Sequence, residues 1–389
     1  MRQNFLLLSF ILILTTNISW GQTSTTGASV VSSAVPFLSI APDSRGGAMG
    51  DAGVATSPDV NSQFWNTAKY VFNESRSGIA LSYTPWLRNL VSDMNLAYLV
   101  GYHKLDDRQS ISASLRYFDL GSMPLFTETG INNGSSNPNE FSIDVGYSLK
   151  LSDNWSGAVT PRFILSDIYN GITSVDLTAG TSFAADVAFY YNKKIYRNHK
   201  NSMVGAGINI SNIGAKVSYD GGATKDFIPT NMRIGGFYSV EIDKYNKFGL
   251  TLDFNKLLVP SPVIDTIDGT PIFSNLGNQN VGPIEGIFVS FTDAPGGFKE
   301  ELSEITVSVG AEYWYSNQFA VRAGYFYEPE SKGDRKFLTF GAGLKMNVFS
   351  LDFSYIYTLK RTSPLENTLR FTLGFDLDDF SKQGKKRRR

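Results

Sequence analysis

Fourteen short runs of this sequence alternate apolar and polar residues, and the joints between the runs alternate between long and short. In the clearest run, residues 141–151, every second residue is apolar, and the residues between them are Ser, Asp, Gly and Lys. Successive side chains of a strand point to opposite faces, so each run has one apolar face and one polar face. A barrel in lipid needs an apolar outer face and accepts a polar lumen. The pattern therefore predicts an all-β fold, a 14-stranded antiparallel transmembrane β-barrel.

Two other architectures compete with the barrel. A soluble β-sandwich also has alternating strands, but Tyr recurs near the strand ends at the apolar positions, which is typical of the aromatic girdles of a membrane barrel. A bundle of membrane helices is disfavoured because the mean hydropathy is only −0.13. Beyond the N-terminal leader, no run approaches the roughly 20 apolar residues that a spanning helix needs.

The sequence divides into four expected segments. Residues 1–21 carry one positive charge, an apolar core and small residues before Gln22, as in a secretory signal peptide; a membrane anchor is the alternative. Residues 22–76 show little alternation and contain the cluster Gly46, Gly47, Gly50 and Gly53, so we expect a compact hatch there. The barrel with its long external loops follows at 77–379, and 380–389 forms a basic periplasmic tail that is either solvated or in contact with an acidic surface.

Loop length predicts the orientation. Outer-membrane barrels have short periplasmic turns and long external loops. Short turns lie near Asp153 and Asn317, and the longest joint spans residues 256–300. The alternation places the protein in the bacterial cell outer membrane with both termini in the periplasm, as an even strand number requires.

The N-terminal glycines and the lumenal charges suggest an internal packing role. Gly47, Gly50 and Gly53 resemble a phosphate loop only weakly, because no apolar strand precedes them. Close packing inside a lumen suits them better, since Gly lets backbones approach closely, and we assign Asn66 to the same packing. The charges at lumenal positions have mixed signs, which suggests internal pairing and contact with a plug. No residue cluster indicates a metal or a cofactor, and a formal net charge of −1 gives no reason to expect nucleic acid.

One histidine could suggest an enzyme. We expect Leu96, Tyr98, Val100 and Tyr102 to face the lipid, which places His103 on the lumenal side of its strand. A Ser-His-Asp hydrolase is conceivable there, but no G-x-S-x-G nucleophile elbow marks a site. We interpret the histidine as a hydrated rim residue and expect no enzymatic activity.

The external loops are unusually apolar. The second loop carries Leu125 and Phe126, and the longest loop carries Phe273, Ile284, Phe288 and Phe291. Solvated loops rarely expose so much apolar surface. These side chains either fold back over the barrel mouth or bind a partner, and we take them as candidate partner-binding residues.

Residues 42–55, followed by Asp59 and the stretch 65–68, resemble the N-terminal hatch of FadL-like outer-membrane proteins. Those hatches commonly carry Asn-Pro-Ala, whereas this chain has Asn66-Thr67-Ala68. Together with the strand end at residues 82–87 and the overall length, the hatch looks like that of the PorV (LptO) family of the Bacteroidota type IX secretion system.

This resemblance implies a barrel plugged by its own N-terminus, with membrane lipid around it. It also implies three partners: a translocon of the SprA/Sov type, the C-terminal signal domains of secreted cargo, and an attachment complex of the PorU type. The implied function is to bind cargo at the translocon and shuttle it to the cell-surface attachment complex. The alternatives are a FadL-like transporter of hydrophobic solutes and an outer-membrane lipid (lipopolysaccharide) deacylase.

Overall fold

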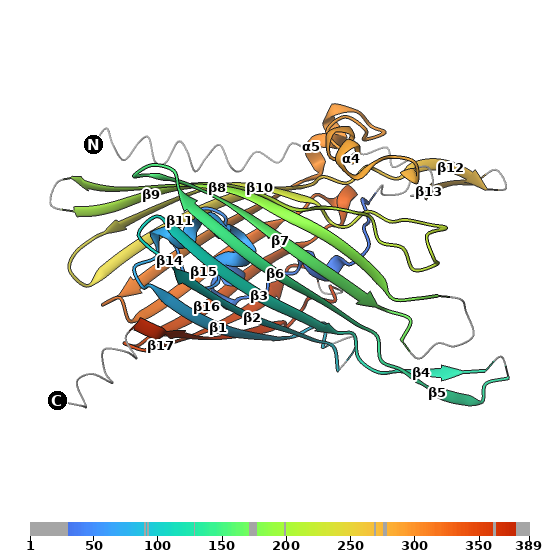
Figure 1. Ribbon diagram of the computed structural model, residues 1–389, viewed down its shortest axis with the longest axis horizontal. Helices are drawn as coiled ribbons and strands as arrows, with labels where there is room; N and C mark the ends of the chain where they lie inside the picture. The colour runs from blue at the N-terminus through green and yellow to red at the C-terminus, as the bar shows by residue number, and fades with distance from the viewer. Residues whose placement is uncertain are drawn as a thin grey trace.

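A closed antiparallel barrel of 14 strands forms the body of the molecule (Figure 1). The computed structural model describes residues 30–88, 91, 93–127, 129–170, 177–197, 200–267, 270–274, 278–360 and 363–378, without the side chains of 197, 263–267 and 270–274. The predicted signal peptide and basic tail lie outside this range.

The barrel strands pair with their neighbours in chain order, and β1 closes the ring on β18. Their bounds are β1 Ser77–Pro85, β2 Asn95–Lys104, β3 Gln109–Asp119, β6 Asn139–Lys150, β7 Trp155–Asp167, β8 Gly180–Arg197, β9 Lys200–Gly214, β10 Asn231–Glu241, β11 Asn246–Leu257, β14 Ile305–Tyr315, β15 Phe319–Tyr327, β16 Lys336–Lys345, β17 Phe349–Thr358 and β18 Leu369–Asp376. Thus the predicted number of barrel strands is confirmed.

The remaining elements lie inside the barrel or at one of its ends. Two hairpins, β4 Met123–Phe126 with β5 Asn132–Ser136 and β12 Val263–Ile267 with β13 Thr270–Ser274, project from the end where β1 finishes (Figure 1). We call this the loop end and the other the turn end. The helices are η1 Pro36–Ser39, α2 Ser44–Gly47, α3 Ser62–Trp65, η2 Thr67–Phe72, α4 Pro283–Val289, α5 Phe298–Ser303 and η4 Glu330–Lys332. In the described parts of the chain, no helix has the length and apolar character needed to cross a membrane.

The alternation predicts the outward face of thirteen strands correctly, but it is wrong for β2. Leu96, Tyr98, Val100 and Tyr102 are only 1–7% exposed and face the lumen, whereas Leu99 is 41% exposed on the outside. The error arises because β2 is apolar on both faces, so periodicity alone cannot orient it. Its larger side chains pack against chain inside the barrel, as in the stacking of Tyr102 on Tyr70 at 4.8 Å.

Candidate functional site

Residues 35–73, which we call the inner segment, run through the barrel from the loop end to the turn end (Figure 1). At the loop end, Phe37 packs with Phe118 of β3, and Arg116 donates to the carbonyl of Leu38 at 2.9 Å. At the turn end, Lys104 donates to the carbonyl of Asn73 at 3.0 Å. The segment thus contacts the lumenal wall along the length of the barrel.

The direction of the inner segment bears on the expected position of the N-terminus. The amide of Ala34 donates to the carbonyl of Phe227, in the β9–β10 loop, at 2.8 Å. The first described residues therefore lie at the loop end, while β1 begins and β18 finishes at the turn end, with Gly78 opposite Asp376. The alternation of strands predicts at which end of the barrel β1 begins and β18 finishes. It does not predict the path of the chain before β1, because that part of the sequence does not alternate.

The inner segment lies close against the barrel backbone at Gly50. This residue has φ +72°, a left-handed conformation that L side chains rarely adopt. A Cβ atom there would lie 2.6 Å from the carbonyl oxygen of Tyr325 in β15. The amide of Gly50 also donates to Thr339 Oγ1 in β16 at 2.8 Å. The two backbones can meet here because position 50 has no side chain and because β15 has a glycine as well, Gly324, where a Cβ would lie 2.1 Å from the Gly50 nitrogen.

The other residues assigned to hatch packing also lie at close contacts. A Cβ at Gly47 would run into the guanidinium of Arg370, and one at Gly53 would run into the ring of Trp65. The Asn66 side chain is fully buried and donates to the carbonyl of Phe189 in β8 at 2.9 Å. Each of these residues therefore sits where the inner segment touches the wall or itself.

Buried ion pairs join the inner segment to the wall. Arg45 pairs with Glu312 of β14 at 2.9 Å and with Asp59 at 2.7 Å. Glu312 also pairs with Arg322 of β15 at 2.6 Å, and Arg322 with Asp352 of β17 at 2.6 Å. In this network, lumenal charges of opposite sign thus pair with one another and with the inner segment. A buried pair gives specificity of position more than net stability, but loss of one partner is costly.

The external candidates fall on separate surfaces. Phe126 is 61% exposed, and Leu125 is partly exposed, both on the β4–β5 hairpin. Ile284 and Phe288 lie on α4, and Phe291 lies two residues beyond its last residue, Val289. Figure 1 shows the β4–β5 hairpin and α4 at different sides of the loop end. The backbone of Phe273 lies in β13, and its side chain is outside the described part of the structure.

The α4 helix is held by one face and open on another. Gly286 faces Phe227 and Pro260 so closely that a Cβ there would lie 2.6 Å from the Phe227 ring. Ile284 and Phe288 are four residues apart and therefore share a helix face. They are 57% and 71% exposed. Among the described residues, this arrangement leaves an apolar face of α4 exposed.

The α5 helix is anchored to the outer wall by charges that sequence reasoning missed. Lys256, on the outward face of β11, is 6% exposed and pairs with Glu301 at 3.0 Å and with Glu304. Lys332 of η4 pairs with Glu304 at 3.1 Å and with Glu300 at 2.6 Å. The available signal was a lysine in an outward strand position, which requires a counter-charge close by.

Two carboxyl groups of this loop have displaced pKa values. Partial burial opposes ionisation of Glu300, but the hydrogen bond from Lys332 outweighs it and lowers the pKa below its ordinary value. Burial raises the pKa of Asp293, although its carboxylate accepts a hydrogen bond from the Ser261 amide at 2.7 Å. The ammonium group of Lys332 thus favours the charged form of Glu300, with which it pairs at 2.6 Å.

The placement of His103 differs from the expectation. Because β2 is inverted, His103 lies on the outer face near the turn end, with Nδ1 2.7 Å from Ser77 Oγ. Among the interactions of the described residues, none joins a carboxylate to this imidazole. The pair therefore lacks the orienting acid of a Ser-His-Asp triad.

Comparison with known protein families gives a match over much of the chain. The model of a family described as type IX secretion system protein PorV matches residues 23–264, more than half of the 389-residue chain. No curated protein matches the sequence.

Solved structures similar to the chain include hydrocarbon channels and transporters. The TodX ΔS2S3 mutant, a monoaromatic hydrocarbon channel, is 12% identical with a TM-score of 0.47 over 86% of this chain and 97% of that one. The Ralstonia pickettii toluene transporter TbuX is 10% identical, with a TM-score of 0.45 over 86% and 97%. The Pseudomonas putida toluene transporter TodX is 10% identical, with a TM-score of 0.45 over 90% and 98%.

Proposed function

The chain belongs to the PorV family of the type IX secretion system, and from this membership we propose that it acts in cargo transfer. In this proposal the barrel lies in the outer membrane and binds the C-terminal signal domain of secreted cargo at a translocon of the SprA/Sov type. It then carries the cargo to an attachment complex of the PorU type at the cell surface.

We further propose that the loop end faces the exterior and that the turn end, with the C-terminal end of β18, faces the periplasm. The length of the loops supports this orientation, because external loops of outer-membrane barrels are the longer ones. In this orientation, the residues around Ala34 lie at the external end. A tag inserted at Asn133, in the exposed β5 strand, should be labelled on intact cells, whereas a tag at the exposed Asp153 should not. Labelling at Asp153 alone would reverse the orientation.

The observation that carries the proposal is the contrast between an occupied lumen and open loops. The inner segment fills the barrel with buried side chains such as Phe64, Trp65 and Tyr70. Phe126 and Phe288, by contrast, are exposed at the loop end. Binding energy at interfaces is concentrated in a few apolar anchors of this kind. Transport of a hydrophobic solute, the alternative, would require the inner segment to move.

The experiment is a pull-down of the full-length protein from detergent-solubilised membranes, with the translocon and a cargo signal domain as readouts. We would compare Phe126→Ser, Phe288→Ser and the double variant. Loss of one apolar anchor of about 1.5–3 kcal/mol corresponds to roughly 10- to 100-fold weaker binding. The control is Leu105→Ser, which changes a side chain 43% exposed at the turn end. Gel mobility with and without heating reports whether each barrel is folded.

The outcomes separate the candidate functions. Reduced recovery of either partner with the loop variants, and normal recovery with Leu105→Ser, supports cargo transfer and identifies which surface binds. Full recovery of both partners with the double variant contradicts the proposed binding surface. In that case, uptake of a hydrophobic solute by vesicles containing the protein would become the function to test.

A further inference from the structure

We propose that an apolar cleft on the outer wall of the barrel, beneath α5, binds one acyl chain of a membrane lipid. The cleft has a volume of about 360 Å³. This lies at the lower end of the range for small-molecule sites. The proposal concerns a different surface from the exposed face of α4 and does not depend on cargo binding.

The floor of the cleft belongs to the barrel. Met232 and Ile234 of β10, Phe254 of β11 and Ile305 of β14 line it, all at outward positions. Cross-strand pairing places Ile234 opposite Phe254 and Met232 opposite Lys256. The floor is therefore continuous with the outward apolar face that meets lipid hydrocarbon along the rest of the wall.

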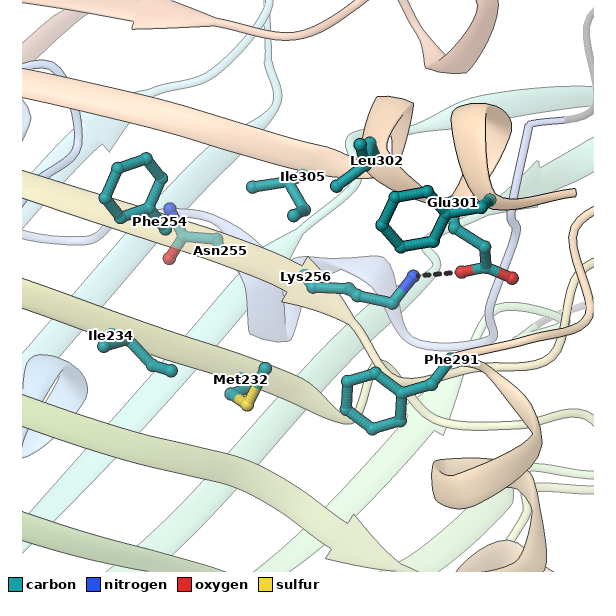
Figure 2. A pocket seen from close by; sticks show the side chains of 10 residues that line it. Met232, Ile234, Phe254, Asn255, Lys256, Phe291, Glu301, Leu302 and Ile305 are labelled. Atoms are coloured by element: carbon teal, nitrogen blue, oxygen red, sulfur yellow. Dashed lines mark hydrogen bonds and ion pairs between the residues drawn. The ribbon is translucent and has the colours of Figure 1, made fainter.

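The long loop forms the other side of the cleft. Phe291 follows α4, and Phe298 and Leu302 belong to α5; all three line the cleft and are 42%, 77% and 52% exposed. Figure 2 shows Ile305 between Phe254 and Leu302, with Phe291 on the other side of Lys256. Large apolar side chains that stay exposed around a hollow are typical of a site that another apolar group fills.

The ion pair between Lys256 and Glu301 forms the edge of the cleft next to α5. Figure 2 shows Lys256 directed toward Glu301, and their Nζ and Oε2 atoms are 3.0 Å apart. The Lys256 ammonium also lies 5.9 Å from the centroid of the Phe291 ring. The carboxylates of α5 thus remove the charge that Lys256 would otherwise present to the lipid. The rest of the cleft lining is almost entirely apolar. Such a lining suits an acyl chain and does not suit a charged headgroup.

Continuity with the lipid-facing wall selects the occupant. The cleft extends the hydrocarbon-facing surface up to α5, so a lipid chain can enter it sideways without leaving its leaflet. A protein partner or a second copy of this chain would have to displace lipid from the same wall first. We therefore assign the site to an acyl chain from the leaflet nearest the loop end.

The test uses the purified full-length protein in phosphatidylcholine vesicles containing a trace of phosphatidylcholine with a diazirine in one acyl chain. After illumination, crosslinked residues are mapped by mass spectrometry. We expect labelling of Phe291, Phe298 and Leu302 to exceed labelling of Tyr117, an outward residue 43% exposed near the loop end of β3. The two surfaces lie on distant strands of the ring, so ordinary lipid contact serves as the reference.

Two variants test the cleft in different ways. Ile305→Trp should fill it from the floor, and Leu302→Asp should place a charge in its wall; each should lower labelling at Phe298 about tenfold. Ile131→Asp, at a loop residue 67% exposed on the β4–β5 hairpin, is the matched control and should leave the labelling unchanged. Heat-modifiable mobility verifies folding of each variant.

Each labelling result either supports or overturns the bound acyl chain. Labelling at the cleft that exceeds Tyr117 and falls in both variants supports a bound acyl chain. Labelling no greater than at Tyr117 overturns the proposal. Strong labelling that survives both variants also overturns it, since it would reflect the exposure of α5 rather than the cleft. If a protein added to the vesicles abolishes labelling at the cleft but not at Tyr117, that protein is the occupant and the lipid assignment is wrong.

Discussion

The inner segment and the α4–α5 loop both depart from the strand pattern, yet the barrel holds them in opposite ways. Inside, the chain is fixed at many points, by backbone contact at Gly50 and by the buried pairs of Arg45. Outside, α5 is held mainly at one charged anchor around Lys256, and its neighbour α4 exposes aromatic side chains. A region whose contacts are satisfied within the chain serves the fold, and a region that leaves apolar contacts open can serve a ligand or partner.

The largest effect is expected at Gly50, where the inner segment packs against the barrel backbone. Gly50→Trp should prevent folding or open an ion leak, because the indole would collide with the backbone of β15 and the left-handed backbone would be strained. Heat-modifiable mobility and conductance in planar bilayers measure both effects. Gly236→Trp is the control, since a Cβ there meets nothing within 4 Å. Normal folding with unchanged conductance in Gly50→Trp would contradict the close packing of the inner segment.

The second prediction compares a buried ion pair with an exposed one. Arg45→Met should lower the free energy of unfolding by about 3–5 kcal/mol, because it leaves Glu312 and Asp59 short of a buried counter-charge. Lys194→Met breaks a pair in which both side chains are more than three-quarters exposed, and it should cost at most about 1 kcal/mol. Urea unfolding in lipid vesicles gives both values. Equal costs would mean that the inner segment contributes little to the fold.

The third prediction concerns the outer anchor alone. Lys256→Met should speed hydrogen exchange in α5 by roughly 10- to 100-fold while leaving the barrel strands protected, since it removes the wall charge that holds Glu301 and Glu304 and leaves the strand ladder intact. Lys336→Met, which breaks pairs with the more exposed Glu330 and Asp334, is the control. If exchange accelerates throughout the barrel instead, α5 is part of the folding core rather than a separable cover.

The sequence predicted the barrel well because membrane strands repeat one physical requirement. Each needs an apolar outward face, and thirteen strands have only one face that qualifies. β2 has two, and its orientation depends on contacts with Tyr70 and other inner residues that lie far away in sequence. The position of the first described residues, around Ala34, at the loop end was hidden for a related reason, because the chain before β1 has no periodicity.

The external surface was predictable only in part. Its apolar residues are visible in the sequence as exceptions to the polarity of loops, and Ile284, Phe288 and Phe291 were recognised in this way. The anchor was not, because Glu301 and Glu304 become meaningful only when folding brings them to Lys256, 45 and 48 residues earlier in the chain. Pairing across such distances depends on the tertiary path of the loop, which no local pattern encodes.

The smallest effect is expected at His103, which belongs to neither region. It is exposed on the outer face and hydrogen-bonded to Ser77, so His103→Ala should change the free energy of unfolding by no more than about 0.5 kcal/mol. Secretion of cargo should also be unchanged, because the residue lies near the turn end, away from the exposed aromatic side chains of the loop end. Secretion assays with Ser77→Ala alongside provide the comparison. Loss of secretion in both variants at normal protein levels would indicate that the Ser77–His103 pair performs chemistry, and it would restore the hydrolase interpretation.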